Sequence, residues 1–240
     1  MTSSPVSLLG IGIYTRAEAA RFLGLSPARI GSWLRGYRYS WGPRNQRRHG
    51  SQPPVLKTDI PRFEGSLAIS FLELMELRIV KEFRAQGVPL QTVRVAWENA
   101  AKAYQTSHPF ADERVFLGGK KIFMAADSDL SSGLLEVSSR HQPFQLVAGP
   151  IFKHSLRIVE FDERTHLARE WWPHGKGVPV VLNPAIAFGA PVVADTRVPT
   201  TIIARFATAH SPGAVAELFD LPQRSVNAAI EYETRPALAA

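Results

Sequence analysis

Arginines at helical spacing are the residues of this sequence that suggest chemistry most directly. Arg29 and Arg35 flank Ser32 in one short segment, and together they would present hydrogen-bond donors on the solvent side of a helix. Arginine pairs bidentately with the O6 and N7 atoms of guanine, and a well-placed pair contributes about 1–3 kcal/mol of discrimination between bases. The chemistry predicted here is recognition of base edges by a helix.

A second group of arginines follows directly, in a stretch that mixes aromatic residues, glycines and prolines: Arg38, Arg44, Arg47 and Arg48. We interpret residues 37–60 as a two-stranded wing with a basic tip. The wing arginines would pair with phosphates, which position a protein on DNA without specifying sequence. Tyr39, Trp41 and His49 could pack on the sugars.

The net charge of the chain is concentrated in its first quarter. The 240 residues carry a formal charge of +7. Residues 1–58 hold nine Lys/Arg and one acid, Glu18, giving +8, whereas residues 59–240 hold nineteen bases and twenty acids, giving −1. A local cationic patch is the footprint expected for a polyanionic partner. A basic run can also be only a solvated face, but its place beside a helical hairpin favours DNA.

Two short helices must position these side chains. Thr15 and Glu18 form a capping box that begins a helix ending at Gly24, and Ser26 with Pro27 begins a second helix that runs to about Arg35. The residues expected to contact DNA are Arg16, Ser26, Arg29, Ser32, Arg35, Arg38, Tyr39, Arg44, Arg47 and Arg48. The alternative is a helical hairpin with a basic loop that binds no DNA.

The rest of the chain predicts an α+β protein in three parts. Two more helices, from Ser70 to about Gln86 and from Pro89 to about Gln105, would complete a winged-helix part over residues 1–106. Residues 107–179 form a β-rich middle section, with a hairpin turn at Gly118-Gly119. Residues 180–240 are predicted to form a small helical domain.

The small helical domain contains an echo of the first hairpin. Val215–Ile230 aligns with Ala19–Leu34, so that the apolar spacings of ten and thirteen residues recur. Possible DNA contacts on this second hairpin are Gln223, Arg224 and Asn227. Acidic neighbours weaken its positive charge, so we favour packing or dimerisation over DNA binding for this copy and leave both open.

The first hundred residues resemble a known family. Residues 14–101, with "YTRAEAARFLGLSPARIGSWLRG", a wing and then "ISFLELMELRIVKEFRAQGVPLQTVRVAWENA", are similar to the MerR-type winged helix. MerR regulators continue into a long dimerising helix, whereas this chain breaks after Gln105 and turns to strands. The resemblance implies a DNA-binding regulator.

A second resemblance lies in the tail, in a box of the pattern Asn-Pro-x-x-x-Phe-Gly-x-Pro-x-x-x-x-Thr-Arg. The box residues are Asn183, Pro184, Phe188, Gly189, Pro191, Thr196 and Arg197. Nearly the whole chain resembles the longer VapB-type antitoxins, which join a MerR-like head to this tail. That resemblance implies pairing with a PIN-domain ribonuclease toxin of the VapC type.

The residues of the box also have a purely structural interpretation. Gly189 before Ala190-Pro191 gives a tight turn, because glycine tolerates positive φ and the residue before proline is extended. Thr196 and Thr200 could cap the next helix, with Arg197 near its start. We favour a structural clasp without a ligand for this box.

Other classes of chemistry have little support. The chain has no cysteine, which excludes disulfides and thiolate metal sites and suits a reducing cytoplasm. His166 and His174 lack a third ligand at metal spacing, and no phosphate-binding loop or nucleophile elbow is present. We expect no metal, no cofactor and no catalysis. No signal peptide is expected, and no apolar stretch approaches the roughly 20 residues that span a bilayer.

The resulting expectation is a cytoplasmic antitoxin that represses its own operator. A homodimer would place two recognition helices about 34 Å apart on one face of the duplex, while the middle section and the box hold the dimer and dock the toxin. One alternative is a stand-alone MerR-like regulator whose β section binds a small effector. An enzyme with an unrecognised site in that section is a further one.

Overall fold

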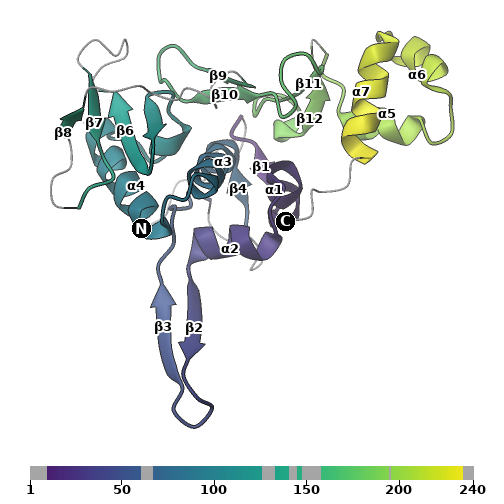
Figure 1. Ribbon diagram of the computed structural model, residues 1–240. Helices are drawn as coiled ribbons and strands as arrows, with labels where there is room; N and C mark the ends of the chain where they lie inside the picture. The colour runs from purple at the N-terminus through teal and green to yellow at the C-terminus, as the bar shows by residue number, and fades with distance from the viewer. Residues whose placement is uncertain are drawn as a thin grey trace, which may run out of the picture.

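The computed structural model describes residues 10–60, 67–125, 133–140, 145–147, 158–194 and 196–234. Its architecture is α+β, as predicted: helices and a projecting hairpin come first, two small antiparallel sheets follow, and three helices end the chain (Figure 1). Most large apolar side chains of the first two parts join one core, which runs from Tyr14 to Leu182.

The first helical pair forms where the sequence predicted it. Helix α1 (Arg16–Leu23) begins at Thr15 with both hydrogen bonds of a capping box, and it ends at Gly24, whose φ of 59° is left-handed. Helix α2 (Pro27–Arg35) begins at Ser26, whose hydroxyl accepts from the Arg29 amide at 3.3 Å. These local caps fix both helix ends and the turn between them.

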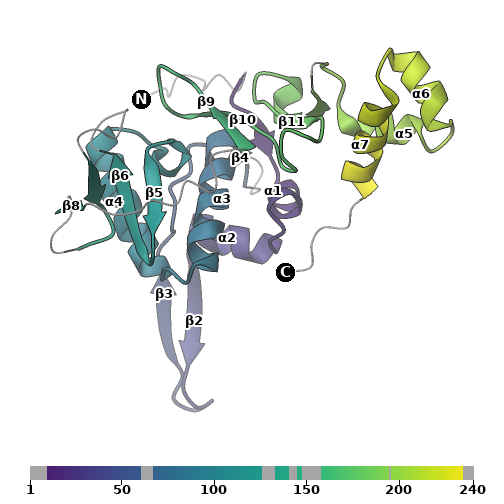
Figure 2. The same cartoon turned by 45° about the horizontal axis from the view of Figure 1, so that its top comes forward.

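A long hairpin, the wing, leaves the end of α2. Strands β2 (Tyr37–Trp41) and β3 (Arg48–Gln52) pair antiparallel with Tyr37 opposite Gln52 and Trp41 opposite Arg48. In both views the wing projects away from the body of the molecule (Figures 1 and 2). Nearly all of its side chains are exposed to solvent.

Two longer helices carry the winged-helix part. Strand β1 (Ile13–Tyr14) pairs with β4 (Ile69–Ser70), which leads directly into α3 (Phe71–Ala85) through a second capping box, between Ser70 and Glu73. Helix α4 (Leu90–Tyr104) follows after the Gly87 turn. The predicted bounds of both helices are confirmed to within two residues.

The middle section contains a four-stranded meander. After the short helix η1 (Pro109–Ala111), strands β5 (Val115–Gly118), β6 (Lys121–Ala125), β7 (Leu134–Glu136) and β8 (Gln145–Val147) pair in sequence order. The predicted turn at Gly118-Gly119 is confirmed, with Gly119 at a φ of 62°.

A second sheet lies on the opposite side of the winged helix from the wing (Figure 2). Its strands are β9 (Val159–Phe161), β10 (Ala168–Trp171), β11 (Val180–Leu182) and β12 (Pro191–Val193), in the order β12-β11-β10-β9. The short helix η3 (Ala187–Gly189) connects β11 to β12. This sheet spans the boundary predicted between residues 179 and 180.

The last three helices form a small unit with its own core. These are α5 (Thr200–Phe206), α6 (Pro212–Phe219) and α7 (Gln223–Thr234), packed around Ile203, Val215 and Val226. The expectation that Thr196 or Thr200 caps α5 is wrong, because Pro199 holds the N-cap position. Instead the Thr196 hydroxyl donates to the Val193 carbonyl at 2.8 Å and the Thr200 hydroxyl donates to the Pro191 carbonyl at 3.2 Å.

Candidate nucleic-acid interface

Helix α2 has the amphipathic form that a recognition helix needs. Ile30, Trp33 and Leu34 are buried against α1, whereas Arg29 and Arg35 are exposed. The apolar side chains hold the helix in place, and the two arginines are left available to a partner. The helix therefore presents the donors that the sequence predicted.

Two guanidinium groups from different helices meet beside Gly31. A Cβ atom at this buried glycine would lie 2.8 Å from Nη2 of Arg35 and 3.3 Å from Nη1 of Arg16. In the part of the chain that the structure describes, neither arginine forms an ion pair. Like charges repel each other at this range, and a bound anion such as a phosphate would relieve that repulsion.

The two predicted serine contacts already have local hydrogen bonds. The Ser26 hydroxyl accepts from the Arg29 amide, and the Ser32 hydroxyl donates to the Arg29 carbonyl at 2.8 Å. Both bonds lie within the helix or its cap, which is a common use of serine near a helix N-terminus. Each oxygen retains acceptor capacity, but the bond that the structure shows stabilises α2 itself.

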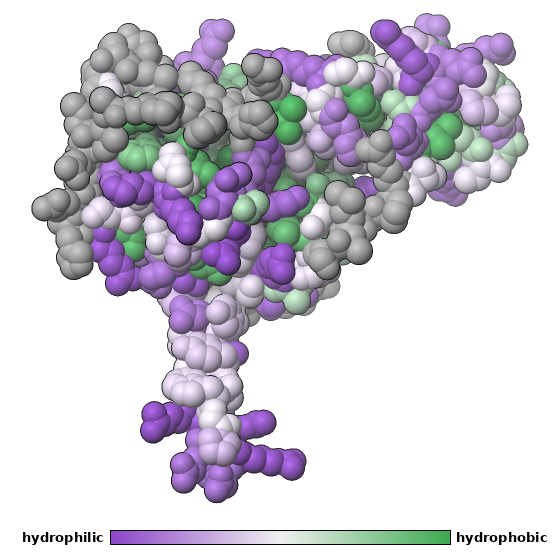
Figure 3. Space-filling view, viewed as in Figure 1, coloured by the Kyte–Doolittle hydropathy of each residue, from purple (hydrophilic) through white to green (hydrophobic). Residues whose placement is uncertain are grey.

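Three of the four wing arginines, Arg44, Arg47 and Arg48, lie at the tip, and Arg38 lies near the base. Arg38, Arg44, Arg47 and Arg48 are all exposed, and Figure 3 shows hydrophilic side chains gathered at the end of the projection. An exposed cationic surface of this kind suits phosphate contacts, which position a protein on DNA without reading its sequence.

One face of the wing is aromatic. Tyr37, Tyr39 and Trp41 alternate along β2 and are 45%, 40% and 47% exposed. The rings of Tyr39 and Trp41 stack with their centroids 5.4 Å apart. Gly50, opposite Tyr39 in β3, leaves room for them, since a Cβ there would lie 2.7 Å from the Tyr39 ring. The prediction that Tyr39 meets DNA sugars remains a prediction.

Hydrogen bonds to and from the backbone of residues 53–55 hold the base of the wing against the body. The Arg94 side chain on α4 donates from Nε to the carbonyls of Pro53 and Pro54, each at 3.1 Å. The Val55 amide donates to the Trp33 carbonyl of α2 at 2.7 Å. The segment after β3 therefore connects α2 with α4, so these contacts fix the orientation of the wing relative to α2.

Sequence reasoning missed a polar cluster in which two members, His108 and Glu76, are buried and the third, Asp59, is exposed. His108 contacts the carboxylates of Asp59 through Nε2 and of Glu76 through Nδ1, the latter at 3.2 Å. Burial alone would lower the pKa of His108, but Glu76 and Asp59 together outweigh it and raise that pKa to about 8. Burial raises the pKa of Glu76, which also accepts from the Trp97 indole at 2.8 Å.

The second hairpin repeats the backbone geometry of the first. Asp220 ends α6 with a φ of 51°, as Gly24 ends α1, and the Leu221 amide bonds to Ala216 as the Leu25 amide bonds to Ala20. The side chains predicted as possible DNA contacts are all exposed: Gln223, Arg224 and Asn227. At the other end of α7, Glu233 forms an ion pair with Arg21 of α1 at 2.8 Å.

Most of the tail box has a structural role. The Asn183 side chain donates to Glu170 at 2.8 Å and accepts from the Ala185 amide, which forms a tight turn after β11. Pro184 packs beside Gly12, where a Cβ would lie 3.3 Å from the proline Cβ. Pro191 begins β12, opposite Leu182.

Gly189 is the box residue that forms a hydrogen bond with the winged helix. Its carbonyl accepts from the Tyr14 hydroxyl at 2.8 Å, and a Cβ there would lie 2.3 Å from that hydroxyl oxygen. Phe188 and Arg197, by contrast, are exposed, with Phe188 at 64%. The contact pair lies 175 residues apart in sequence, so no local pattern pointed to it.

Comparison with known proteins adds two family matches. Residues 12–97 match a family described as "Putative DNA-binding HTH domain", and residues 180–232 match one described as "Protein of unknown function (DUF433)". The first match covers α1, α2, the wing, α3 and the first half of α4, and the second covers the box and the second hairpin.

Two similar proteins come from Mycobacterium tuberculosis. "Putative antitoxin VapB45" is 28% identical over 192 residues, which cover 76% of this chain and 77% of the relative. "Uncharacterized protein Rv2308" is 24% identical over 246 residues, covering 98% and 96%. The crystal structure of Rv2018 from the same organism shares the fold, with a TM-score of 0.61, 22% identity, and coverage of 92% of this chain and 99% of that one.

The described residues include no candidate for a membrane-spanning helix or for a metal site. None of the helices there combines the length and apolarity needed to cross a membrane. No group of three or more histidine, aspartate and glutamate side chains in those same ranges is arranged to hold a metal ion.

Proposed function

We propose that this protein binds operator DNA through α2 and the wing, represses its own transcription, and neutralises a PIN-domain ribonuclease toxin of the VapC type. In this proposal it acts by binding, without a catalytic step, and as a homodimer whose recognition helices lie about 34 Å apart. The observation that carries the DNA-binding part is the meeting of Arg16 and Arg35 beside Gly31, next to the exposed Arg29.

The charge distribution and the match to a DNA-binding helix-turn-helix family support the same part. In a MerR-like arrangement α2 would enter the major groove and the wing would contact flanking phosphates. The predicted DNA contacts, from Arg16 to Arg48, all lie on these two elements or at the start of α1. The antitoxin part is supported by the distant similarity to "Putative antitoxin VapB45".

DNA binding is tested by fluorescence anisotropy on the segment upstream of the protein's own gene, with unrelated DNA of equal length alongside. Arg29→Ala should weaken specific binding about 5- to 150-fold for each recognition helix of the dimer, because a base contact contributes about 1–3 kcal/mol. Arg47→Ala should weaken both DNAs and lower the salt slope by about 2 in a dimer, since each phosphate contact contributes about 0.9.

Two exposed arginines elsewhere serve as matched variants. Arg164→Ala, in a turn of the middle section, controls for the loss of one positive charge and should bind as the wild type does. Arg224→Ala asks whether the second hairpin touches DNA. Unchanged affinity and salt slope in both Arg29→Ala and Arg47→Ala would overturn the assignment.

The antitoxin part has its own experiment. The tagged chain is co-expressed with the product of the neighbouring open reading frame, and the purified material is assayed for that product and for ribonuclease activity. Co-purification with suppressed activity is expected. A neighbouring product that stays fully active and unbound would contradict the toxin partnership while leaving DNA binding intact.

A second candidate function is a stand-alone MerR-like regulator whose middle section binds a small effector. The observation that favours it is an apolar cavity between α3 and the middle strands. It differs from the first candidate in requiring no toxin.

A further inference from the structure

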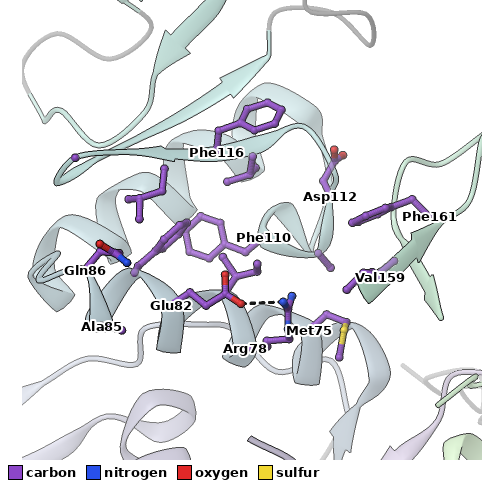
Figure 4. Close-up of a pocket in the computed structure, with 17 residues that line it drawn as sticks. Met75, Arg78, Glu82, Ala85, Gln86, Phe110, Asp112, Phe116, Val159 and Phe161 are labelled. Atoms are coloured by element: carbon purple, nitrogen blue, oxygen red, sulfur yellow. Dashed lines mark ion pairs between the residues drawn. The ribbon is translucent and has the colours of Figure 1, made fainter. Parts of the chain in front are cut away.

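The cavity between the winged helix and the two sheets has a volume of about 610 Å³. Protein interiors hold few voids larger than a water molecule, and sites for small molecules typically measure about 300–1,000 Å³. The walls come from α3, η1, β5 and the β9–β10 pair (Figure 4). Four separate elements therefore surround one space, which is the form of a ligand pocket rather than of a flat docking surface.

The cavity follows one face of α3. Its lining includes Met75, Ile79, Phe83 and Gln86, which recur at the three- and four-residue spacing of a helix face. From Met75 to Gln86 the helix rises about 16 Å. Met75 is buried and Gln86 is exposed, so the space runs from a closed end near β9 to a mouth at the end of α3.

The walls are mainly apolar and aromatic. Phe83 and Phe110 meet edge to face with their centroids 5.3 Å apart, Phe161 comes from β9, and Val115 and Leu117 of β5 add alkyl groups. Figure 4 shows the Phe110 ring between α3 and the strands. Edge-to-face rings leave ring faces available to an aromatic or alkyl guest.

Each charged group at the cavity has a partner of opposite sign in the protein. Arg78 forms an ion pair with Glu82 at 2.8 Å, and Asp112 accepts from Arg114 Nε at 2.8 Å and Nη2 at 2.6 Å. A charged guest would be taken out of water without a charge left to compensate it, which is unfavourable. A neutral guest avoids that cost.

We propose that this cavity binds an uncharged, largely apolar small molecule that enters past Ala85 and Gln86. Such a molecule would be the effector of the second candidate function, on which this assignment rests, and its binding requires neither DNA nor a toxin. Its occupant would contact α3, which also supports the recognition hairpin, because Lys81 of α3 donates to the Leu23 carbonyl at the end of α1 at 2.7 Å.

Binding is tested with N-phenyl-1-naphthylamine, an uncharged dye whose emission rises in apolar surroundings. Saturable binding of one dye per full-length chain is expected, with displacement by dodecanol at lower concentration than by dodecanoate or dodecylamine. Ile79→Trp, which fills the cavity from α3, should weaken dye binding at least tenfold.

Two further variants guard against misfolding as the cause. Ala85→Trp blocks the exposed mouth, where a large side chain is readily accommodated, and should also weaken binding at least tenfold. Ala103→Trp, on the exposed face of α4 and outside the cavity, is the matched control and should bind as the wild type does.

Three outcomes would overturn the proposal. The first is the absence of saturable dye binding by a chain that unfolds cooperatively, which would mean that part of the chain itself or a closed packing fills the space. The second is wild-type affinity in Ala85→Trp and in a folded Ile79→Trp. The third is displacement by the charged amphiphiles in preference to dodecanol.

Discussion

Replacing His108 with glutamine should remove a pH dependence of stability that the polar cluster creates. His108 bridges Asp59, which follows the wing, and Glu76 on α3. Its pKa is raised from the usual 6.5 to about 8. Because the folded-state pKa exceeds the unfolded one, the stabilisation is complete below about pH 6.5 and is lost as the pH rises through about 8.

The size of the effect follows from that difference. Since one pKa unit corresponds to about 1.4 kcal/mol, the protonated bridge contributes about 2 kcal/mol to the free energy of unfolding at low pH. Urea unfolding followed by tryptophan fluorescence at pH 6, 7, 8 and 9 measures it. The wild type should lose about 2 kcal/mol more than His108→Gln between pH 6 and pH 9.

Two other variants separate the causes. Glu76→Gln keeps an acceptor for the Trp97 indole but removes a negative charge, so it should reduce the pH dependence in part. His210→Gln controls for losing a histidine on the exposed surface of the C-terminal helices. Parallel stability profiles for the wild type and His108→Gln from pH 6 to pH 9 would refute a protonated His108 held between two carboxylates.

The contacts between the winged helix and the tail support two further predictions. Gly189→Ala should lower the free energy of unfolding by about 2–4 kcal/mol, because φ is 86° there and the new Cβ would clash with the Tyr14 side chain. Urea unfolding measures this loss. Gly213→Ala is the control, because a Cβ at Gly213 meets nothing within 4 Å. A double-mutant cycle of Arg21→Ala and Glu233→Gln should give a coupling free energy of about 0.5–2 kcal/mol. We expect a value near the lower limit, because the Arg21 side chain is one-third exposed and solvent screens the ion pair. Additive effects of the two substitutions would show that the ion pair contributes nothing.

Local structure was largely predictable from the sequence. Thr15, Gly24 and Ser26 fix the ends of α1 and α2 through hydrogen bonds within four residues, and such signals are visible in the sequence itself. The wing, the Gly118-Gly119 turn and the repeated hairpin were predictable for the same reason. The place of the charge excess followed from counting. One local prediction failed where tertiary contacts competed, because the hydroxyl of Thr200 turns to Pro191 instead of capping α5.

The features that join the parts were decided only by the tertiary structure. Tyr14 meets Gly189, Arg21 meets Glu233, and His108 lies between Asp59 and Glu76, across separations of 175, 212 and up to 49 residues. The meeting of Arg16 and Arg35 and the cavity beside α3 depend in the same way on how elements pack. Caps and turns act over a few residues and leave a local mark in the sequence, whereas these contacts form only when the core brings distant segments together.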